Sequence, residues 1–218
     1  MFVQVENTNR CNARCVWCAH STMRRKQGIM DWGLYTRIVD ELASIGPQLQ
    51  GFCLCGLGEP MLDPMFFDKL QYAREKLVCP LTVYTNGSLL TESNAKQLAS
   101  LADDLYISIN AIRAEDRKAI MGLDDYIQVA EISRSIIESG LARIWIAAIA
   151  DKGCFEALGK EAFLTYWGKN AFLHLEGNWA GSIWPMIIEP VAPCVRPFNY
   201  FHILWDGRVA LCCFDAEG

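Results

Sequence analysis

Three cysteines near the start of the chain are spaced so that their sulfur atoms can share one metal centre. Cys11, Cys15 and Cys18 lie in the segment CNARCVWC, a C-x3-C-x2-C arrangement. Thiolates are the usual ligands of iron–sulfur clusters, and a short loop allows several of them to wrap one cubane. Three ligands leave one iron open, and an open metal position can bind a substrate or cofactor. The alternatives are a structural zinc site, for which His20 could supply the fourth ligand, and reduced thiols that bind nothing.

The composition favours metal-binding thiols over disulfides. The chain of 218 residues contains ten cysteines, and its N-terminus lacks the basic and apolar regions of a secretory signal. Reducing compartments keep thiols available for metal binding or catalysis. Hydrophobic residues make up 52% of the chain and the net charge is −5. We therefore expect a folded cytoplasmic protein without a membrane span or a nucleic-acid partner.

The elements that position the cysteines alternate between apolar strands and amphipathic helices. Strands are predicted at residues 2–6, 51–55, 81–85, 105–109, 143–149 and 172–176. Helices are predicted at 32–45, 64–77, 91–101, 125–139 and 155–167. Asp31 caps the first helix, Pro64 is the first residue of the second, and Gly140 ends the fourth. Such alternation implies an α/β fold with a parallel sheet, either doubly wound or curled into a full or partial barrel.

Polar residues follow two further predicted strands. In either architecture, ligands bind at the carboxyl ends of the strands, where the cysteine loop also lies. After the second strand, the Gly58-Glu59-Pro60 triplet lets the backbone approach a ligand and offers a carboxylate to an ammonium group. Ser108 and Asn110 share one face at the end of the fourth strand. The triplet is also compatible with an ordinary turn before the next helix, and two polar residues at a strand end are common without a ligand.

The cysteine motif, with Trp17 as the aromatic residue before Cys18, resembles the signature of the radical S-adenosylmethionine (SAM) superfamily. The resemblance implies a partial (β/α)6 TIM-like barrel and a [4Fe-4S] cluster on the three cysteines. It also implies that SAM chelates the open iron through its amino and carboxylate groups. Electron transfer then splits SAM into methionine and a 5'-deoxyadenosyl radical, which abstracts hydrogen from a substrate.

The same resemblance assigns roles to individual residues. Trp17 is expected to pack near the adenine of SAM. The Gly58-Glu59-Pro60 triplet is similar to the family's GGEP motif, which binds the methionyl amine, although Leu57 replaces the first glycine. Ser108 and Asn110 are similar to a Ser-x-Asp-type pair that contacts the ribose and carboxylate, with Asn110 in place of the acid. The sequence singles out no catalytic side chain.

The tail of the chain carries a second cysteine pattern. Cys194, Gly207 and Cys212 form C-x12-G-x4-C around a hairpin predicted at residues 201–212, with an Asp-Gly turn. This pattern is similar to the opening of SPASM and twitch extensions, which bind an auxiliary [4Fe-4S] cluster. We therefore expect a barrel over residues 1–185 and a β-hairpin extension over 186–218. Two thiolates rarely hold a cubane, so an auxiliary cluster that finds further ligands and a lost one remain alternatives.

The resemblance extends to SPASM peptide maturases and to proteins of the 2-deoxy-scyllo-inosamine dehydrogenase type. It implies oxidation of a small hydroxylated molecule or modification of a peptide, with a flavodoxin or ferredoxin as reducing partner. The alternative from another class is a non-catalytic or decayed scaffold that binds zinc or an iron–sulfur cluster.

Overall fold

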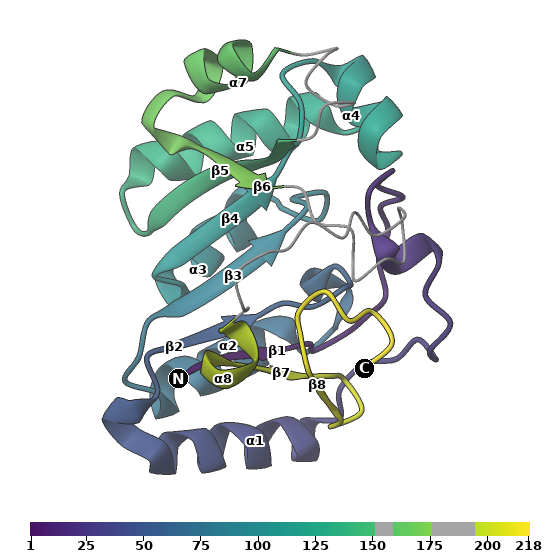
Figure 1. Cartoon of the computed structure of the whole chain (residues 1–218). Coiled ribbons are helices and arrows are strands. Elements are labelled where there is room, and N and C mark those ends of the chain that lie inside the picture. Colours follow the sequence, from purple (N-terminus) through teal and green to yellow (C-terminus); the bar gives the residue numbers. More distant parts are fainter. Residues whose placement is uncertain (151–158, 176–194) are drawn as a thin grey trace. The chain divides into compact units, whose positions relative to one another are not determined.

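Strands and helices alternate along the chain as the sequence predicts (Figure 1). The structure is a computed structural model and describes residues 1–150, 159–175 and 195–218. Its strands are β1 (Phe2–Val5), β2 (Gly51–Leu54), β3 (Leu81–Thr85), β4 (Asp104–Ser108), β5 (Arg143–Ala150), β6 (Ala171–Leu175), β7 (Tyr200–Ile203) and β8 (Val209–Ala210). Its helices are α1 (Trp32–Ile45), α2 (Phe66–Lys76), α3 (Glu92–Leu101), α4 (Ala114–Met121), α5 (Tyr126–Ser139), α7 (Lys160–Trp167) and α8 (Arg196–Asn199). The predicted α/β class is confirmed.

The chain divides into two compact units. The first unit contains residues 1–12, 17–82 and 177–218, and the second contains residues 13–16 and 83–176. In the first unit the strand order is β2-β1-β7-β8, with β1 parallel to both neighbours and β7 antiparallel to β8. In the second unit the order is β3-β4-β5-β6, and the pairs β4–β5 and β5–β6 are parallel.

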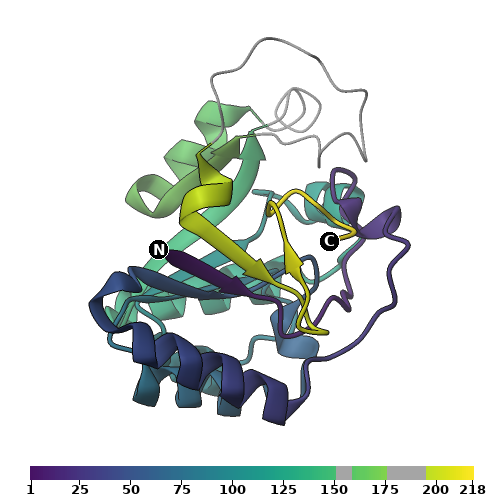
Figure 2. The same ribbon diagram turned by 60° about the horizontal axis from the view of Figure 1, so that its bottom comes forward.

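The predicted C-terminal hairpin forms and joins the sheet of the first unit. Strand β7 lies parallel to β1, and their pairing ends with Val5 opposite Ile203 (Figure 2). Gly207, with φ of +86°, makes the turn to β8, where the amide of Leu204 donates to the carbonyl of Arg208 at 2.8 Å. Glycine adopts this left-handed backbone without a steric penalty. The last part of the chain therefore lies beside the strand that leads into the cysteine loop.

Local capping explains one end each of α1, α3 and α5. The Asp31 carboxylate accepts hydrogen bonds from the amides of Gly33 and Leu34 and so caps α1 as predicted. Thr91 and Asn94 form a reciprocal capping box at the start of α3. Gly140, in the left-handed region, ends α5. These caps satisfy backbone groups that the first and last turns of a helix leave without partners.

Two helix predictions differ from the structure. Helix α2 begins at Phe66 rather than at Pro64, because Asp63 accepts from the backbone amide of Met65 and makes a separate turn before the helix. Helix α4 is absent from the sequence-based expectations. The first residues of the helix predicted at 155–167 lie outside the described residues, whereas its end at Trp167 is confirmed. The boundary predicted between residues 185 and 186 also lies outside them.

None of the helices in the described ranges is long and apolar enough to cross a membrane.

Candidate active site

The cysteine loop is closed at its base by a ladder of buried hydrogen bonds in the first unit. The hydroxyl of Thr8 donates to the carbonyl of Gly28 at 2.7 Å. Asn9 accepts from the amide of Gly28 at 2.8 Å and donates to the carbonyl of Lys26 at 3.0 Å. Thr8 and Asn9 are both buried. The segments before Cys11 and after residue 25 are therefore tied together, and the cysteines lie on the loop between them.

The three cysteines are half-buried along this loop. Cys18 lies against a small apolar cluster of Ala19, Leu57 and Ala216. Burial raises the pKa of the Cys18 thiol, and a hydrogen bond from the backbone of His20 opposes that shift. A metal that binds there must displace the proton, since the thiolate is the ligand.

The middle of the loop, residues 13–16, belongs to the second unit. The amide of Arg14 donates to the carbonyl of Met121 at 2.8 Å, and that of Val16 donates to Ile120 at 3.0 Å. Residues 13–16 therefore pair with the end of α4. Trp17, which follows them, is buried.

The zinc alternative finds no support in the side chains. The Nε2 atom of His20 lies 2.9 Å from the carbonyl oxygen of Asn9, with which it shares a hydrogen bond. Across the described ranges, no three His, Cys, Asp or Glu side chains converge on a point where one ion could bind. Zinc requires such convergence, whereas the thiolates of a cubane attach to separate irons. The cluster on Cys11, Cys15 and Cys18 therefore remains a prediction.

The Gly58-Glu59-Pro60 turn is held directly against the segment that precedes Cys11. The amide of Glu59 donates to the carbonyl of Arg10 at 2.8 Å. A Cβ atom at Gly58 would lie 2.5 Å from that carbonyl oxygen and 2.6 Å from the one of Thr8. Only glycine allows so close an approach. The first unit therefore brings the predicted triplet and the start of the cysteine loop together.

A network of buried polar side chains supports this turn. Asn7 donates to the carbonyl of Pro60 at 2.9 Å and to the carboxylate of Asp63 at 3.0 Å. Lys69 donates to the same carboxylate and to the carbonyl of Met30, both at 2.6 Å. Lys69 and Asp63 are almost completely buried. The sequence analysis missed this pair, because a lysine and an aspartate six residues apart match no motif.

Asn110 lies in a strained turn at the end of β4 and bonds to the neighbouring strand. Its backbone is left-handed, with φ of +55°, a conformation that asparagine tolerates better than most residues. Its side-chain oxygen accepts from the amide of Ile149 at 2.9 Å, and its nitrogen lies 3.4 Å from the sulfur of Met121. The side chain therefore ties the end of β4 to β5. Ser108 is half-buried at the end of β4, and a SAM contact from either residue remains a prediction.

A buried arginine holds the strand ends of the second unit. Arg117, on α4, is fully buried and pairs with Asp125 at 2.6 Å. Its guanidinium also donates to the carbonyls of Asn86 at 2.8 Å and Ser108 at 3.2 Å, which follow β3 and end β4. The sequence analysis did not single out Arg117, because a charged residue inside a predicted connection gives no pattern.

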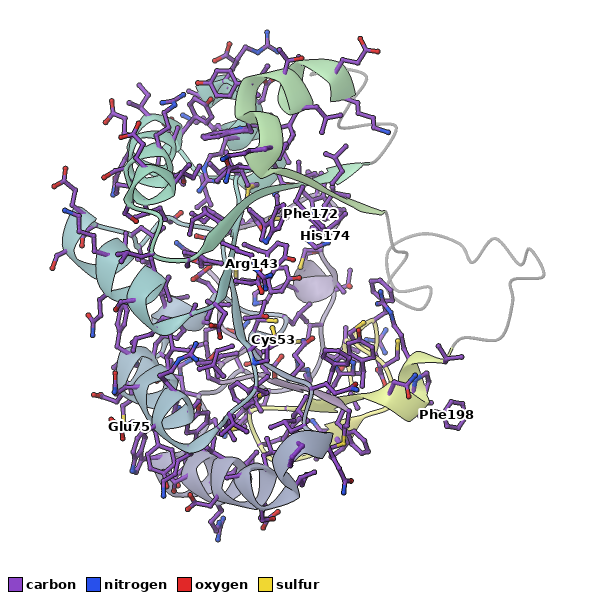
Figure 3. All side chains as sticks on the ribbon, turned by 90° about the vertical axis from the view of Figure 1, so that its left-hand side faces the viewer. Cys53, Glu75, Arg143, Phe172, His174 and Phe198 are labelled. Carbon is purple, nitrogen blue, oxygen red and sulfur yellow. The ribbon has the colours of Figure 1, made fainter. Side chains whose placement is uncertain are left out.

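Aromatic side chains cover one face of the strands in the second unit. Tyr84 stacks on Tyr106 with ring centroids 4.4 Å apart, and Phe172 meets Tyr106 at 5.1 Å and His174 at 4.7 Å. Phe172 and His174 lie close together in Figure 3. Burial lowers the pKa of His174, so that its imidazole is neutral at pH 7. These half-buried rings form an uncharged aromatic face on β3, β4 and β6, which the sequence analysis missed.

The tail cysteines can be described only in part. Cys212 and Cys213 are half-buried, and a guanidinium nitrogen of Arg196 lies 3.3 Å from the sulfur of Cys213. Burial, and then the neighbouring Cys212, raise the pKa of Cys213. Cys194 lies outside the described residues, so the auxiliary cluster remains a prediction.

Comparison with known families identifies the family to which these features belong. The model of the radical SAM superfamily matches residues 5–151, which include the cysteine loop, the Gly-Glu-Pro turn and β4. The chain belongs to the radical SAM superfamily. Enzymes of this family use a [4Fe-4S] cluster and SAM.

Curated relatives support the assignment and are all longer than this chain. The chain is 32% identical over 122 residues to the tungsten-containing aldehyde ferredoxin oxidoreductase cofactor-modifying protein of Pyrococcus furiosus, which covers 56% of this chain and 34% of the relative. It is 30% identical over 146 residues to the mycofactocin maturase MftC of Mycobacterium tuberculosis H37Rv, or 66% of this chain and 36% of the relative. It is 31% identical over 115 residues to the SAM-dependent 2-deoxy-scyllo-inosamine dehydrogenase of Niallia circulans, or 49% and 43% of the two chains. The matched regions thus span less than half of each relative.

Solved structures share the fold. SuiB of Streptococcus suis bound to the precursor peptide SuiA matches with a TM-score of 0.77 at 14% identity, over 98% of this chain and 59% of SuiB. BtrN in complex with AdoMet and 2-DOIA matches with a TM-score of 0.63 at 19% identity, over 99% of this chain and 74% of BtrN. At these identities the likeness shows the TIM-like radical SAM fold alone.

Proposed function

We propose that this chain is the catalytic part of a radical SAM enzyme, with a barrel over residues 1–185 and a hairpin extension over 186–218. Cys11, Cys15 and Cys18 hold the [4Fe-4S] cluster in this proposal. The observation that carries it is the close approach of the Gly58-Glu59-Pro60 turn to the backbone that leads into Cys11. That contact brings an amine-binding carboxylate to the loop that would hold the cluster.

The residues of the cysteine loop and of the Gly58-Glu59-Pro60 turn suit the bound cofactors. Three thiols supply soft ligands and leave one iron open. The Glu59 carboxylate, which is buried, accepts from the amide of Met61 at 3.2 Å. A carboxylate accepts several hydrogen bonds at once, so Glu59 can also accept from the ammonium group of SAM. Trp17 offers a buried aromatic surface for the adenine.

When bound, the cluster and SAM supply an electron and a 5'-deoxyadenosyl radical that abstracts hydrogen. This chain's own residues would orient the reactants and exclude water. The three cysteines would bind three irons and leave the fourth open, and Glu59 would bind the amino end of SAM. The aromatic face of Tyr84, Tyr106, Phe172 and His174 would offer an apolar surface to the substrate. A flavodoxin or ferredoxin would reduce the cluster.

The aromatic face also bears on the substrate. The Asp104 carboxylate accepts from Nε1 of Trp145, whose ring stacks on Tyr106. It also pairs with Arg143 at 2.5 Å, so that the two charges offset each other. We infer that the part of the substrate on this face is uncharged and flat or apolar. The C–H face of a small hydroxylated carbocycle and the apolar part of a peptide side chain both meet that description, in keeping with the dehydrogenase and maturase names of the relatives.

The test is SAM cleavage by anaerobically reconstituted protein. We expect iron and sulfide to bind, and dithionite to produce 5'-deoxyadenosine. Glu59→Gln removes the charge that holds the ammonium group. It should slow 5'-deoxyadenosine formation by roughly 10- to 100-fold through a higher KM for SAM, the factor for a lost charged hydrogen bond.

Glu75→Gln is the matched control, because Glu75 lies exposed on α2 of the same unit and bonds only locally with Gln71 at 2.7 Å (Figure 3). It should cleave SAM at the wild-type rate. If the loaded protein forms no 5'-deoxyadenosine, the scaffold alternative replaces the enzymatic one.

A further inference from the structure

Glu6 is a buried carboxylate that the proposed chemistry does not use. It directly follows β1, and only 3% of its surface is exposed. Its two oxygens accept from the two terminal nitrogens of Arg25 at 2.6 and 2.7 Å, and the Arg25 side chain is 5% exposed. Such a fork-shaped pair is strong and directional. It connects the strand before the cysteine loop to the segment after it.

The same carboxylate reaches two further segments. One oxygen accepts from the amide of Leu57 at 3.1 Å, just before the Gly58-Glu59-Pro60 turn. The other accepts from the amide of Trp205 at 3.4 Å, in the C-terminal hairpin. Because a buried carboxylate needs several donors, the four groups satisfy one another. Glu6 thus joins the cysteine loop, the Gly-Glu-Pro turn and the hairpin.

The C-terminal residues Ala216 and Glu217 also contact the segment that follows the cysteines. Arg25 donates from Nε to the carbonyl of Ala216 at 2.6 Å. The carboxylate of Glu217 accepts from two consecutive backbone amides, Arg24 at 2.8 Å and Arg25 at 3.0 Å. These bonds join residues that are more than 190 positions apart in the sequence.

Further contacts join the C-terminal residues to the segment that follows the cysteines, residues 18–28. Ala216 packs with Ala19 and Leu57, and Cys18 lies against this cluster. The Trp205 ring lies so close to Gly28 that a Cβ there would come within 2.4 Å of it, and its Nε1 donates to the carbonyl of Lys26 at 3.2 Å. In Figures 1 and 2 the yellow C-terminal segment runs beside the purple segment that follows the cysteines.

We propose that residues 204–217 act as a clamp on the cysteine loop, through Trp205, Ala216 and Glu217, so that the first cluster is retained by contacts that need no second cluster. This inference rests on the proposed function, because it takes Cys18 as a cluster ligand. In this proposal the C-terminal extension stabilises the cysteine loop without any contribution from Cys194 or Cys212. Glu217 is a positioning residue in this scheme, since it acts on the loop backbone.

The first experiment measures alkylation of Cys18 by iodoacetamide in cluster-free protein, followed by mass spectrometry. Glu217→Ala removes both amide contacts at an exposed position, so folding is preserved. We expect Cys18 to react roughly fivefold faster, because the lost hydrogen bonds restrain a local opening but are weakened by water at this exposed position. Glu75→Ala, an exposed glutamate in the same unit, should leave the rate unchanged. Equal rates for wild type and Glu217→Ala would overturn the clamp.

The second experiment measures iron release to a chelator from the reconstituted protein. Glu217→Ala should lose the iron held by the cysteine loop several-fold faster than wild type, whereas Cys212→Ser should lose it at the wild-type rate. Faster loss from Cys212→Ser but not from Glu217→Ala would assign retention to a second cluster and overturn the clamp. If no variant binds iron, the proposed function fails, and the alkylation rates still decide the clamp.

Discussion

Arg25 and Arg117 both have a buried guanidinium group, but their hydrogen-bond partners lie at different distances along the sequence. Arg25, in the first unit, binds Glu6 and Ala216, which lie 19 and 191 residues away. Arg117, in the second unit, binds Asp125 and the carbonyl of Asn86, which lie 8 and 31 residues away. The cysteine loop is therefore held by remote segments, and the ends of β3 and β4 by nearby ones.

The energetic setting of the two arginines differs as well. The Glu6 carboxylate is almost completely buried, whereas Asp125 keeps 18% of its side chain exposed. A buried charge that loses its partner costs far more than one that water can reach. The first unit should therefore be more sensitive to the loss of its arginine, which leads to the following tests.

Arg25→Met should have the largest effect. It leaves the Glu6 carboxylate buried with only two backbone amides as donors, and we expect a loss of about 3–5 kcal/mol in the free energy of unfolding. Arg117→Met should cost about 2–4 kcal/mol, because Asp125 can recruit water but the carbonyls of Asn86, Ser108 and Ile109 lose a donor. Denaturant unfolding measures both values. Arg113→Met, which breaks the exposed pair with Asp116 on α4, is the control and should cost under about 1 kcal/mol.

The comparison breaks if Arg117→Met is the more damaging of the two. That outcome would mean that the carbonyl contacts of the second unit outweigh the buried carboxylate of the first.

Gly58→Ala should have the next largest effect, and only on the first unit. The new methyl group would meet the carbonyl oxygens of Arg10 and Thr8 at distances far inside van der Waals contact. We expect a loss of about 1–3 kcal/mol in stability from this overpacking, with weaker SAM binding because the turn must move away from the loop. Calorimetric titration with SAM and denaturant unfolding measure the two effects. Gly33→Ala, near the start of α1, is the control, because there the added methyl group meets only the end of the Asp31 side chain. Unchanged SAM affinity in Gly58→Ala would argue against the role of this turn.

The smallest effect concerns pH and compares one histidine from each unit. Burial lowers the pKa of His174 in the second unit, and burial together with Arg196 lowers that of His202 in the first. As the pH falls below about 6.5, the unfolded chain takes up these protons before the folded one does, so stability falls, whereas above that pH it is unaffected. His174→Phe and His202→Phe should each flatten the fall in unfolding free energy between pH 7 and pH 5. A variant with the slope of the wild type would show that its histidine titrates normally.

Local signals in the sequence predict much of the fold. Asp31 and Gly140 mark helix ends through hydrogen bonds and backbone angles that involve only nearby residues, and the structure confirms both. The strands are found for the same reason, because alternation of apolar residues is a local pattern. The Gly58-Glu59-Pro60 turn and the cysteine loop come together as expected, since both follow strands that pair in parallel.

The features that sequence reasoning missed depend on partners far along the chain. The Asp63 carboxylate accepts hydrogen bonds from Asn7 and Lys69. It also accepts from the amide of Met65 in a turn that precedes α2, so the helix begins at Phe66 rather than at Pro64. Helix α4 escapes detection because the buried Arg117 interrupts its apolar pattern. No spacing rule indicates that Glu6 will meet residues near the C-terminal end, because that contact is created only when β7 pairs with β1.

The parallel pairing of β1 with β7 has a consequence for biosynthesis. A ribosome releases β1 and the cysteines first, and β7 emerges almost 200 residues later. Until then the first strand lacks one of its two neighbours, and the side chain of Glu6 has no hairpin amide to accept from. Domains generally fold as units once their sequence is available. The cysteine loop of this protein therefore reaches its final shape only after translation has passed the hairpin, and we expect the proposed cluster to be inserted after that point.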